Sequence, residues 1–140
     1  MGRHGRSTGN PLPYTRQFNN PAPTDDPAAV IAVERIRGPI LLVCGGSDQV
    51  WHSCYYANAI KERLTAKKSR QRPTLLSYPD AGHGVGTLVP YEPGNGYTLN
   101  VPFINATTGR TLSLGGASPP ANELALAKVW PRFLTFLRTS

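Results

Sequence analysis

Two side chains in this chain of 140 residues have the types and the spacing of an acid–base pair. Asp48 lies four residues beyond the apolar run at 40–44, and His83 lies five residues beyond the extended segment at 74–78. An aspartate can accept the Nδ1–H of a histidine and fix its tautomer, and the histidine can then take a proton from a nucleophile. Each residue alone also fits a plainer interpretation, Asp48 as a turn former or helix cap and His83 as a loop residue.

These two segments are predicted to be strands of one parallel sheet. Residues 40–44 run without a polar residue between glycine-containing turns, which is typical of a strand buried on both faces. Residues 74–78 follow Pro73 and end at a Pro-Asp-Ala-Gly turn. Parallel strands place their C-terminal ends at one edge of a sheet, where open α/β sheets bind ligands. We therefore expect Asp48 and His83 to lie side by side at that edge.

A helix is predicted between the two strands, which gives a right-handed β-α-β unit. It begins at Ser53, the expected N-cap, and ends near Ala66. Its buried side is marked by an apolar stripe, Ala57, Ile60 and Leu64. A second helix is predicted over 121–137, with Asn122 as the candidate cap and Pro131 expected to kink or split it. The apolar stripe of this helix consists of Leu126, Trp130, Phe133 and Leu137.

The segment between the second strand and the last helix, residues 84–120, is rich in glycine. Within it, residues 101–104 and 110–114 flank a short turn-forming stretch and predict a small hairpin. A loop this long inside a compact domain is usually functional, often as a lid.

The composition indicates one soluble domain with many loops. Hydrophobic residues make up 39% of the chain, and there are 14 glycines and 14 prolines. Residues 1–28 show no periodicity and are predicted to be an extended or disordered linker, so that the folded domain occupies 29–140. No run approaches the roughly 18 apolar residues of a membrane span, and the N-terminus lacks the apolar core of a secretory signal. We expect no membrane partner.

The two cysteines are too few for a disulfide framework, so a reducing compartment and a cytoplasmic location fit best. Cys54 lies near a predicted helix start, where a thiolate is favoured, but two adjacent tyrosines indicate a packed surface. It is therefore a weak candidate nucleophile. The three histidines and two cysteines show no metal-ligand spacing, and no metal or other cofactor is expected.

Much of the net charge of +7 lies in the basic segment, residues 61–72, which has six basic side chains and one acid. The plainest interpretation is a solvated helix end. Contact with the phosphates of a ligand and binding of nucleic acid are the alternatives. Nucleic-acid readers usually interleave aromatic residues or carry a module signature, and neither is present here. We therefore expect no nucleic-acid partner.

Four segments of the chain match the sequence of one family in the same order. They are residues 31–48, residues 75–83, Gly115-Gly116 with the helix that contains Trp130 and Phe133-Leu134, and the earlier stretch 10–14. Together they resemble the C-terminal domain of the acyl-CoA thioesterase and bile acid-CoA:amino acid N-acyltransferase family. The resemblance implies that residues 29–140 are the C-terminal portion of an α/β-hydrolase catalytic domain, with a β-α-β unit of parallel strands, a long loop and a C-terminal helix.

The resemblance also implies a triad in the chain order nucleophile, aspartate, histidine. By motif position, Asp48 matches the acid of the family and His83 its base. The family's nucleophile is a serine or cysteine in a strand-to-helix elbow before the acid, whereas residues 1–38 contain only Ser7 and no strand–elbow–helix pattern. We therefore expect the C-terminal fragment of an acyl-CoA thioester hydrolase or acyltransferase, inactive alone. The intact parent would take an acyl-CoA substrate, whose phosphates the basic segment could contact.

A non-catalytic binding or interaction module is the alternative interpretation. A fragment of this kind would expose the sheet edge that normally pairs with upstream strands, and exposed edges invite association. The sequence defines no particular protein partner.

Overall fold

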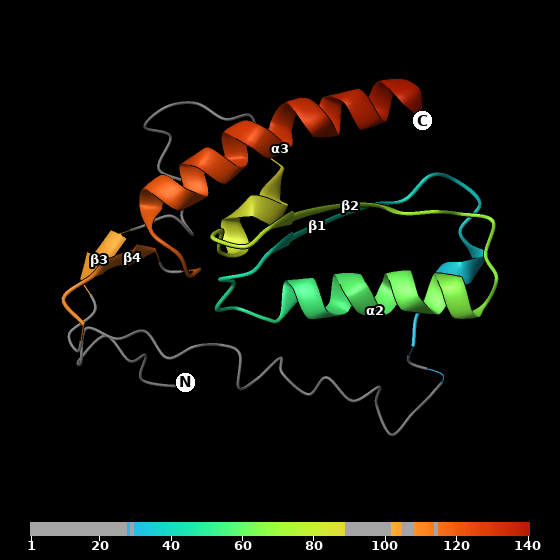
Figure 1. Ribbon diagram of the computed structural model, residues 1–140, viewed down its shortest axis with the longest axis horizontal. Helices are drawn as coiled ribbons and strands as arrows, with labels where there is room; N and C mark the ends of the chain where they lie inside the picture. Colours follow the sequence, from blue (N-terminus) through green and yellow to red (C-terminus); the bar gives the residue numbers. More distant parts are fainter. Residues whose placement is uncertain (1–27, 29, 89–101, 105–107, 114) are drawn as a thin grey trace.

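The computed structural model describes residues 28, 30–88, 102–104, 108–113 and 115–140. Figure 1 shows two helices on opposite sides of a pair of strands. The elements, in which η marks a short 3-10 helix, are η3 (Val33–Arg35), β1 (Leu41–Gly45), α2 (Ser53–Ala66), β2 (Thr74–Tyr78), η4 (His83–Thr87), β3 (Pro102–Ile104), β4 (Thr111–Ser113) and α3 (Pro119–Thr139). The linker predicted at 1–28 lies outside the described residues, apart from Ala28.

β1 and β2 form the parallel pair that the sequence predicts. Their register runs from Leu41 opposite Thr74 to Gly45 opposite Tyr78, so that both strands end at the same level. Because α2 connects them, the β-α-β unit and the α/β class are confirmed. The loops that follow the two strands therefore leave the sheet side by side.

Ser53 connects the start of α2 to the end of β1 by hydrogen bonds. Ser53 is the first residue of the helix and His52 occupies the cap position, so the predicted cap is wrong. The Ser53 hydroxyl donates to the Gly45 carbonyl and accepts from the Gly45 amide, at 3.2 Å in each case. A hydroxyl that is engaged with the strand does not cap the amides of its own helix. Ala57 and Leu64 are buried as predicted, and the helix ends at Ala66.

α3 begins earlier than predicted and continues through Pro131. Ser118 is its cap, because the hydroxyl accepts from the Ala121 amide at 3.4 Å. Two prolines follow at the first helical positions, where an amide hydrogen would lack a helical acceptor in any case. Pro131 does not split the helix, which ends at Thr139. Pro131 lies on the exposed side, so water can reach the carbonyl that loses its helical donor.

The core lies between the strand pair and the first half of α3. Its buried members are Leu76, Ala81, Val85, Ala125, Leu126 and Val129. The predicted apolar stripe of α3 is therefore only partly right, since Leu137 is 54% exposed while Asn122 is buried. Trp130 and Phe133 are half-buried and contact each other, with ring centroids 5.7 Å apart. Because Ala81 and Val85 are core residues, the intervening segment with His83 is held at both ends.

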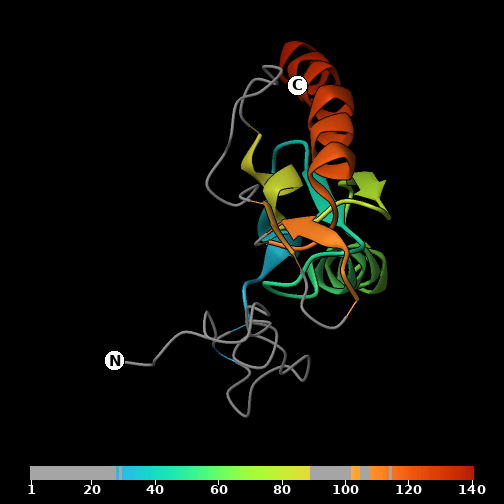
Figure 2. The ribbon, with the colours of Figure 1, turned by 90° about the vertical axis from the view of Figure 1, so that its left-hand side faces the viewer.

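The small hairpin predicted in the long loop is present. β3 and β4 pair antiparallel, with Pro102 opposite Ser113 and Ile104 opposite Thr111. Figure 2 shows this hairpin in orange beside the start of α3. The Ser113 amide donates to the Ala117 carbonyl at 2.7 Å, which connects the hairpin to the turn before α3.

An ion pair joins η3 to the outer part of α2. The Arg63 guanidinium donates two hydrogen bonds to the Glu34 carboxylate, at 2.6 and 2.8 Å. These bonds hold the pKa of Glu34 down at about 2, and Glu34 in turn raises the pKa of Arg63. One cation of the basic segment is therefore engaged within the fold.

Replacing Glu34 by glutamine should lower the melting temperature at neutral pH. Folding lowers the pKa of this carboxyl from 4.5 to about 2, so its stabilising effect is complete above the higher value and is lost as the pH falls through the lower one. The difference in melting temperature should therefore shrink on acidification, and also in high salt. Glu62→Gln is the control, because it removes the charge of an exposed glutamate next to Arg63 in the sequence. A difference that stayed constant on acidification would contradict the ion pair.

Candidate active site

Three loops meet at the C-terminal edge of the strand pair. The first two, which follow β1 and β2, are joined by a hydrogen bond from the Ser47 amide to the Ala81 carbonyl at 2.9 Å. The third loop, residues 115–118, contributes the Gly115 carbonyl. This carbonyl accepts from the Gln49 amide at 3.2 Å and from the His83 amide at 2.9 Å. A single acceptor therefore ties the loop that carries Asp48 to the loop that carries His83.

Glycines allow these loops to approach so closely. A methyl group on Gly45 would collide with the carbonyl oxygens of Ala81 and Gly82, and one on Gly82 would collide with those of Gly115 and Gly116. Gly116 also has a φ of +94°, a backbone conformation that residues with a side chain rarely adopt. The junction is therefore backbone packed against backbone.

Asp48 is buried in this junction with both carboxylate oxygens engaged. Its side chain is 2% exposed, and Oδ2 lies 3.0 Å from the Nδ1 atom of His83. Oδ1 accepts from the amides of Val50 at 2.9 Å and Trp51 at 3.2 Å. Asp48 is thus both the turn former of the plainer interpretation and the partner of a histidine.

His83 presents a partly exposed ring at the same edge. Its side chain is 28% exposed. Its amide is fixed on Gly115, and its Nδ1 atom faces Asp48. With Nδ1 directed at a carboxylate, Nε2 is the nitrogen that can exchange a proton with a nucleophile or a substrate. The expected proximity of the two side chains is therefore confirmed, while their catalytic roles remain a prediction.

Asn122 supports the junction from α3, a role that its predicted function as a cap did not anticipate. The side chain is buried, accepts from the Gly82 amide at 2.7 Å and donates to the Gly116 carbonyl at 3.0 Å. It is inside the helix, because Ser118 provides the cap. Its amide group fixes the residue before His83 relative to the third loop.

Trp51 contacts both members of the pair and was not predicted from the sequence. Its amide bonds to Asp48, and its ring meets the His83 ring edge-on, with centroids 6.0 Å apart and planes at 75°. The Trp51 ring also contacts Tyr56 of α2, with ring centroids 6.0 Å apart. The indole is 44% exposed, so it leaves apolar surface beside the imidazole. Its position three residues after a candidate acid is the only sequence signal that could have indicated it.

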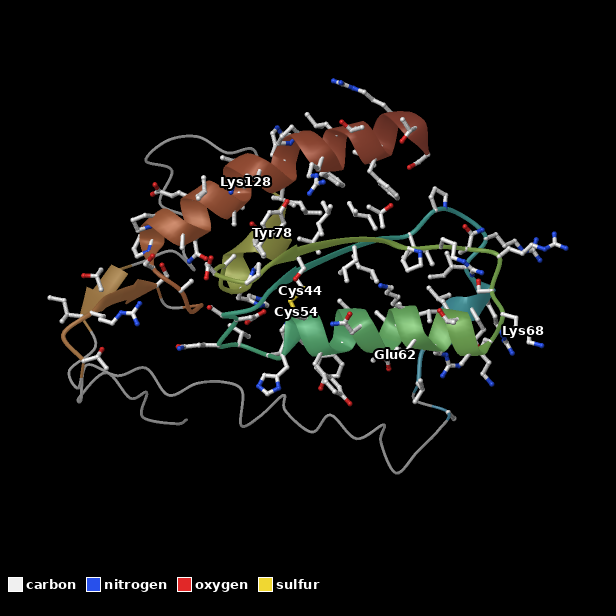
Figure 3. The ribbon with its side chains drawn as sticks, viewed as in Figure 1. Cys44, Cys54, Glu62, Lys68, Tyr78 and Lys128 are labelled. Carbon is white, nitrogen blue, oxygen red and sulfur yellow. A yellow bond between two sulfur atoms is a disulfide. The ribbon has the colours of Figure 1, made fainter. Side chains whose placement is uncertain are left out.

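The two cysteines form a disulfide, which corrects the interpretation that they are free thiols. Figure 3 shows the bond between β1 and α2. The turn between these elements brings Cys44 and Cys54 to a Cα–Cα distance of 4.9 Å, although ten positions separate them in sequence. Cys54 in this state has no thiolate, so it is not the nucleophile. The cytoplasmic location stays a prediction, and the disulfide removes one of the arguments for it.

The basic segment lies at the far end of α2 from the Asp48–His83 pair. The helix has 14 residues, a length of about 20 Å, and Figure 3 shows Lys68 at the end opposite to the disulfide. An open pocket on the outer face of α2, lined in part by Asn58 and Glu62, is likewise separate from the pair. The pair therefore has no contribution from the basic segment.

Of the other histidines, His52 is exposed before α2 and His4 lies outside the described residues. The described part of the chain has no cluster of three or more histidine, cysteine, aspartate or glutamate residues that could hold a metal ion. None of its helices is both long and apolar enough to cross a membrane.

Comparison with known proteins gives one consistent relationship. The family described as "BAAT / Acyl-CoA thioester hydrolase C terminal" matches residues 6–140. Human acyl-coenzyme A thioesterase 6 is 29% identical over 125 residues, which are 89% of this chain and 28% of that protein. Human acyl-coenzyme A thioesterase 1 is 32% identical over 119 residues, covering 85% of this chain and 26% of that protein. The mouse peroxisomal succinyl-coenzyme A thioesterase is 40% identical over 108 residues, covering 77% and 24%. The chain thus spans about a quarter of the length of these relatives.

Replacing Gly82 by alanine should destabilise the chain far more than replacing Gly84. The new methyl group at position 82 would overlap two carbonyl oxygens, whereas a methyl group at position 84 has open space. We expect a loss of about 1–3 kcal/mol in the free energy of unfolding for Gly82→Ala and less than about 0.5 kcal/mol for Gly84→Ala. Urea denaturation of both variants measures the difference. Equal midpoints would show that the loops do not approach as closely as described.

Proposed function

Because this chain belongs to the BAAT/acyl-CoA thioester hydrolase C-terminal family, we propose that it supplies the acid and the base of a triad that cleaves or transfers the acyl group of acyl-CoA thioesters. The observation that carries the proposal is the 3.0 Å contact between Asp48 Oδ2 and His83 Nδ1. The two residues come from successive strand ends, in the chain order acid then base. Sequence and geometry therefore support the same two residues independently.

In the proposed reaction, His83 takes the proton of a serine or cysteine nucleophile as that atom attacks the thioester carbonyl. The carbon–sulfur bond breaks, and the proton held by His83 passes to the departing thiolate of coenzyme A. Water or an amine then attacks the acyl-enzyme, with His83 removing its proton and returning it to the nucleophile. Asp48 keeps Nδ1 protonated and stabilises the imidazolium in both half-reactions.

The surroundings of Asp48 suit this role. The carboxylate is buried, its Oδ1 atom accepts from two amides, and its Oδ2 atom is directed at the imidazole ring that would become charged during the reaction. Removal from water strengthens the attraction between the two charges. The exposed indole of Trp51 supplies an apolar surface beside the imidazole ring, where an acyl chain can bind.

The nucleophile is proposed to come from outside this chain. Gly5-Arg6-Ser7-Thr8-Gly9 does have the letters of a G-x-S-x-G elbow, so Ser7 has to be considered. An elbow leads directly into a helix, but Pro11 and Pro13 follow within a few residues and oppose one. β1 and β2 form a two-stranded sheet within the described residues, so each has an outer edge with backbone groups that a further strand can pair.

A chimera tests the roles of the pair. The C-terminal quarter of human acyl-coenzyme A thioesterase 1 that this chain matches is replaced by the present sequence, and thiol release is followed with acyl-CoA substrates from succinyl to palmitoyl. We expect turnover. Asp48→Asn should lower kcat by about 10⁴-fold, and His83→Ala by at least as much.

His52→Ala is the matched control for these variants, because it removes an exposed histidine of the same loop region. It should leave kcat unchanged. A chimera that turned over substrate equally well with and without His83 would exclude the proposed base.

The purified chain alone should release no thiol from acyl-CoA above the uncatalysed rate, and Ser7→Ala should make no difference. The measurement is a thiol-reactive dye assay, or mass spectrometry of the released coenzyme A. Turnover by the chain that disappeared in Ser7→Ala would identify a nucleophile within it and contradict this part of the proposal.

A further inference from the structure

The disulfide closes the loop that carries Asp48. Cys44 is the fourth residue of the five-residue strand β1, before that loop, and Cys54 is the second residue of α2, after it. Hydrogen bonds hold the same loop at Ser53 and Gln49, but these bonds are individually weak and reversible. In the chain-entropy description, a cross-link over a loop of this length changes the balance between closed and open states by about a hundredfold. The disulfide is therefore the strongest single restraint on the loop.

The disulfide also reaches His83 through aromatic side chains. It fixes the first turn of α2, which carries Tyr56. Tyr56 contacts Trp51, and Trp51 contacts the ring of His83. Both partners of the pair thus depend on the position of the start of α2, Asp48 through its loop and His83 through this aromatic contact.

The two sulfur atoms differ in their access to solvent. Cys44 is 1% exposed, whereas Cys54 is only partly buried and lies 3.7 Å from the hydroxyl of Ser77, an exposed residue. Exchange with an external thiol should therefore begin at Cys54.

We propose that Cys44 and Cys54 are positioning residues for the Asp48–His83 pair, and that reduction of their disulfide loosens the pair. The inference rests on the proposed function and adds redox control of the same site. Neither cysteine touches the reacting atoms, so both act through the loop and through α2.

The redox step is thiol–disulfide exchange with a dithiol reductant. One thiolate of the reductant attacks the sulfur of Cys54, and the bond to Cys44 breaks, leaving a thiolate that takes up a proton. The second thiol of the reductant then attacks the mixed disulfide and releases Cys54 as a thiol. Two electrons and two protons pass to the protein, and the reductant leaves as its cyclic disulfide. A small disulfide oxidant reverses the change.

Hydrogen exchange on the purified chain tests the proposal, with dithiothreitol as the reductant. The chain has two cysteines, so the reagent has one target, and a mass gain of two hydrogens verifies its reduction. On reduction, the amides of Gln49, Val50 and Trp51 and the Nδ1 proton of His83 should exchange at least about tenfold faster. Amides of the buried part of α3, residues 125–129, should not change.

A double variant, Cys44→Ala with Cys54→Ser, provides the second measurement. It should show the faster exchange without reductant and no response to reductant. Unchanged rates in a fully reduced wild-type chain would overturn the proposal. So would two free thiols that persist in the presence of oxidised glutathione.

The exchange rate of the His83 Nδ1 proton, measured by NMR, also separates this inference from the proposed function. If the oxidised chain had no slowly exchanging Nδ1 proton on His83, the acid–base pair itself would be absent and the proposed function would fail. If that proton were present and equally protected in both redox states, the pair would stand and the redox control would be excluded.

Discussion

The close approach of three backbone segments at the end of the strand pair is the constraint on which the rest of the site depends. The carbonyl of Gly115 accepts from the loops of both Asp48 and His83, and it can do so because Gly45, Gly82 and Gly116 have no side chains to separate the segments. Side-chain contacts adjust to small displacements, whereas contacts between main-chain atoms do not. The distance between Asp48 and His83 is consequently set by the main chain.

The buried side chains of Asp48 and Asn122 both have hydrogen-bond partners at the site. Asp48 uses one oxygen for two amides and the other for His83, while Asn122 uses both ends of its amide group on Gly82 and Gly116. A buried group that lost a partner would be strongly destabilising. This network therefore penalises rearrangement of the loops, and the same bonds that orient His83 also maintain the junction. Position and stability have one physical origin here.

How far the sequence predicted this arrangement differs from element to element. The apolar run at 40–44, the helical stripe after it and the turn after 78 were enough for the β-α-β unit, and the topology of that unit then placed Asp48 beside His83. Local sequence patterns do not indicate which of two possible hydrogen-bond partners a polar side chain has in the folded chain. Ser53 and Asn122 both looked like caps, but a strand end and a neighbouring loop hold them instead. The disulfide and the contact of Trp51 with His83 depend on tertiary distances. The position of Trp51 three residues after Asp48 hints at the contact, but it does not specify which ring the indole meets.

The structure also shows which parts of the proposed site this chain contains. Asp48, His83 and the groups bonded to them come from the loops after β1 and β2, from the third loop and from Asn122 of α3, all of which are described residues. In the proposed reaction the nucleophile approaches the Nε2 side of His83, and the backbone bonds at that edge join the three loops to one another and, through Ser113, to β4. β1 leads directly into the Asp48 loop. A further parallel strand that paired with the outer edge of β1 would therefore end beside that loop. The outer edge of β1 could promote association of the isolated chain, because its backbone groups can pair with another strand. Pairing at the same edge would align a segment that carries the nucleophile with Asp48 and His83.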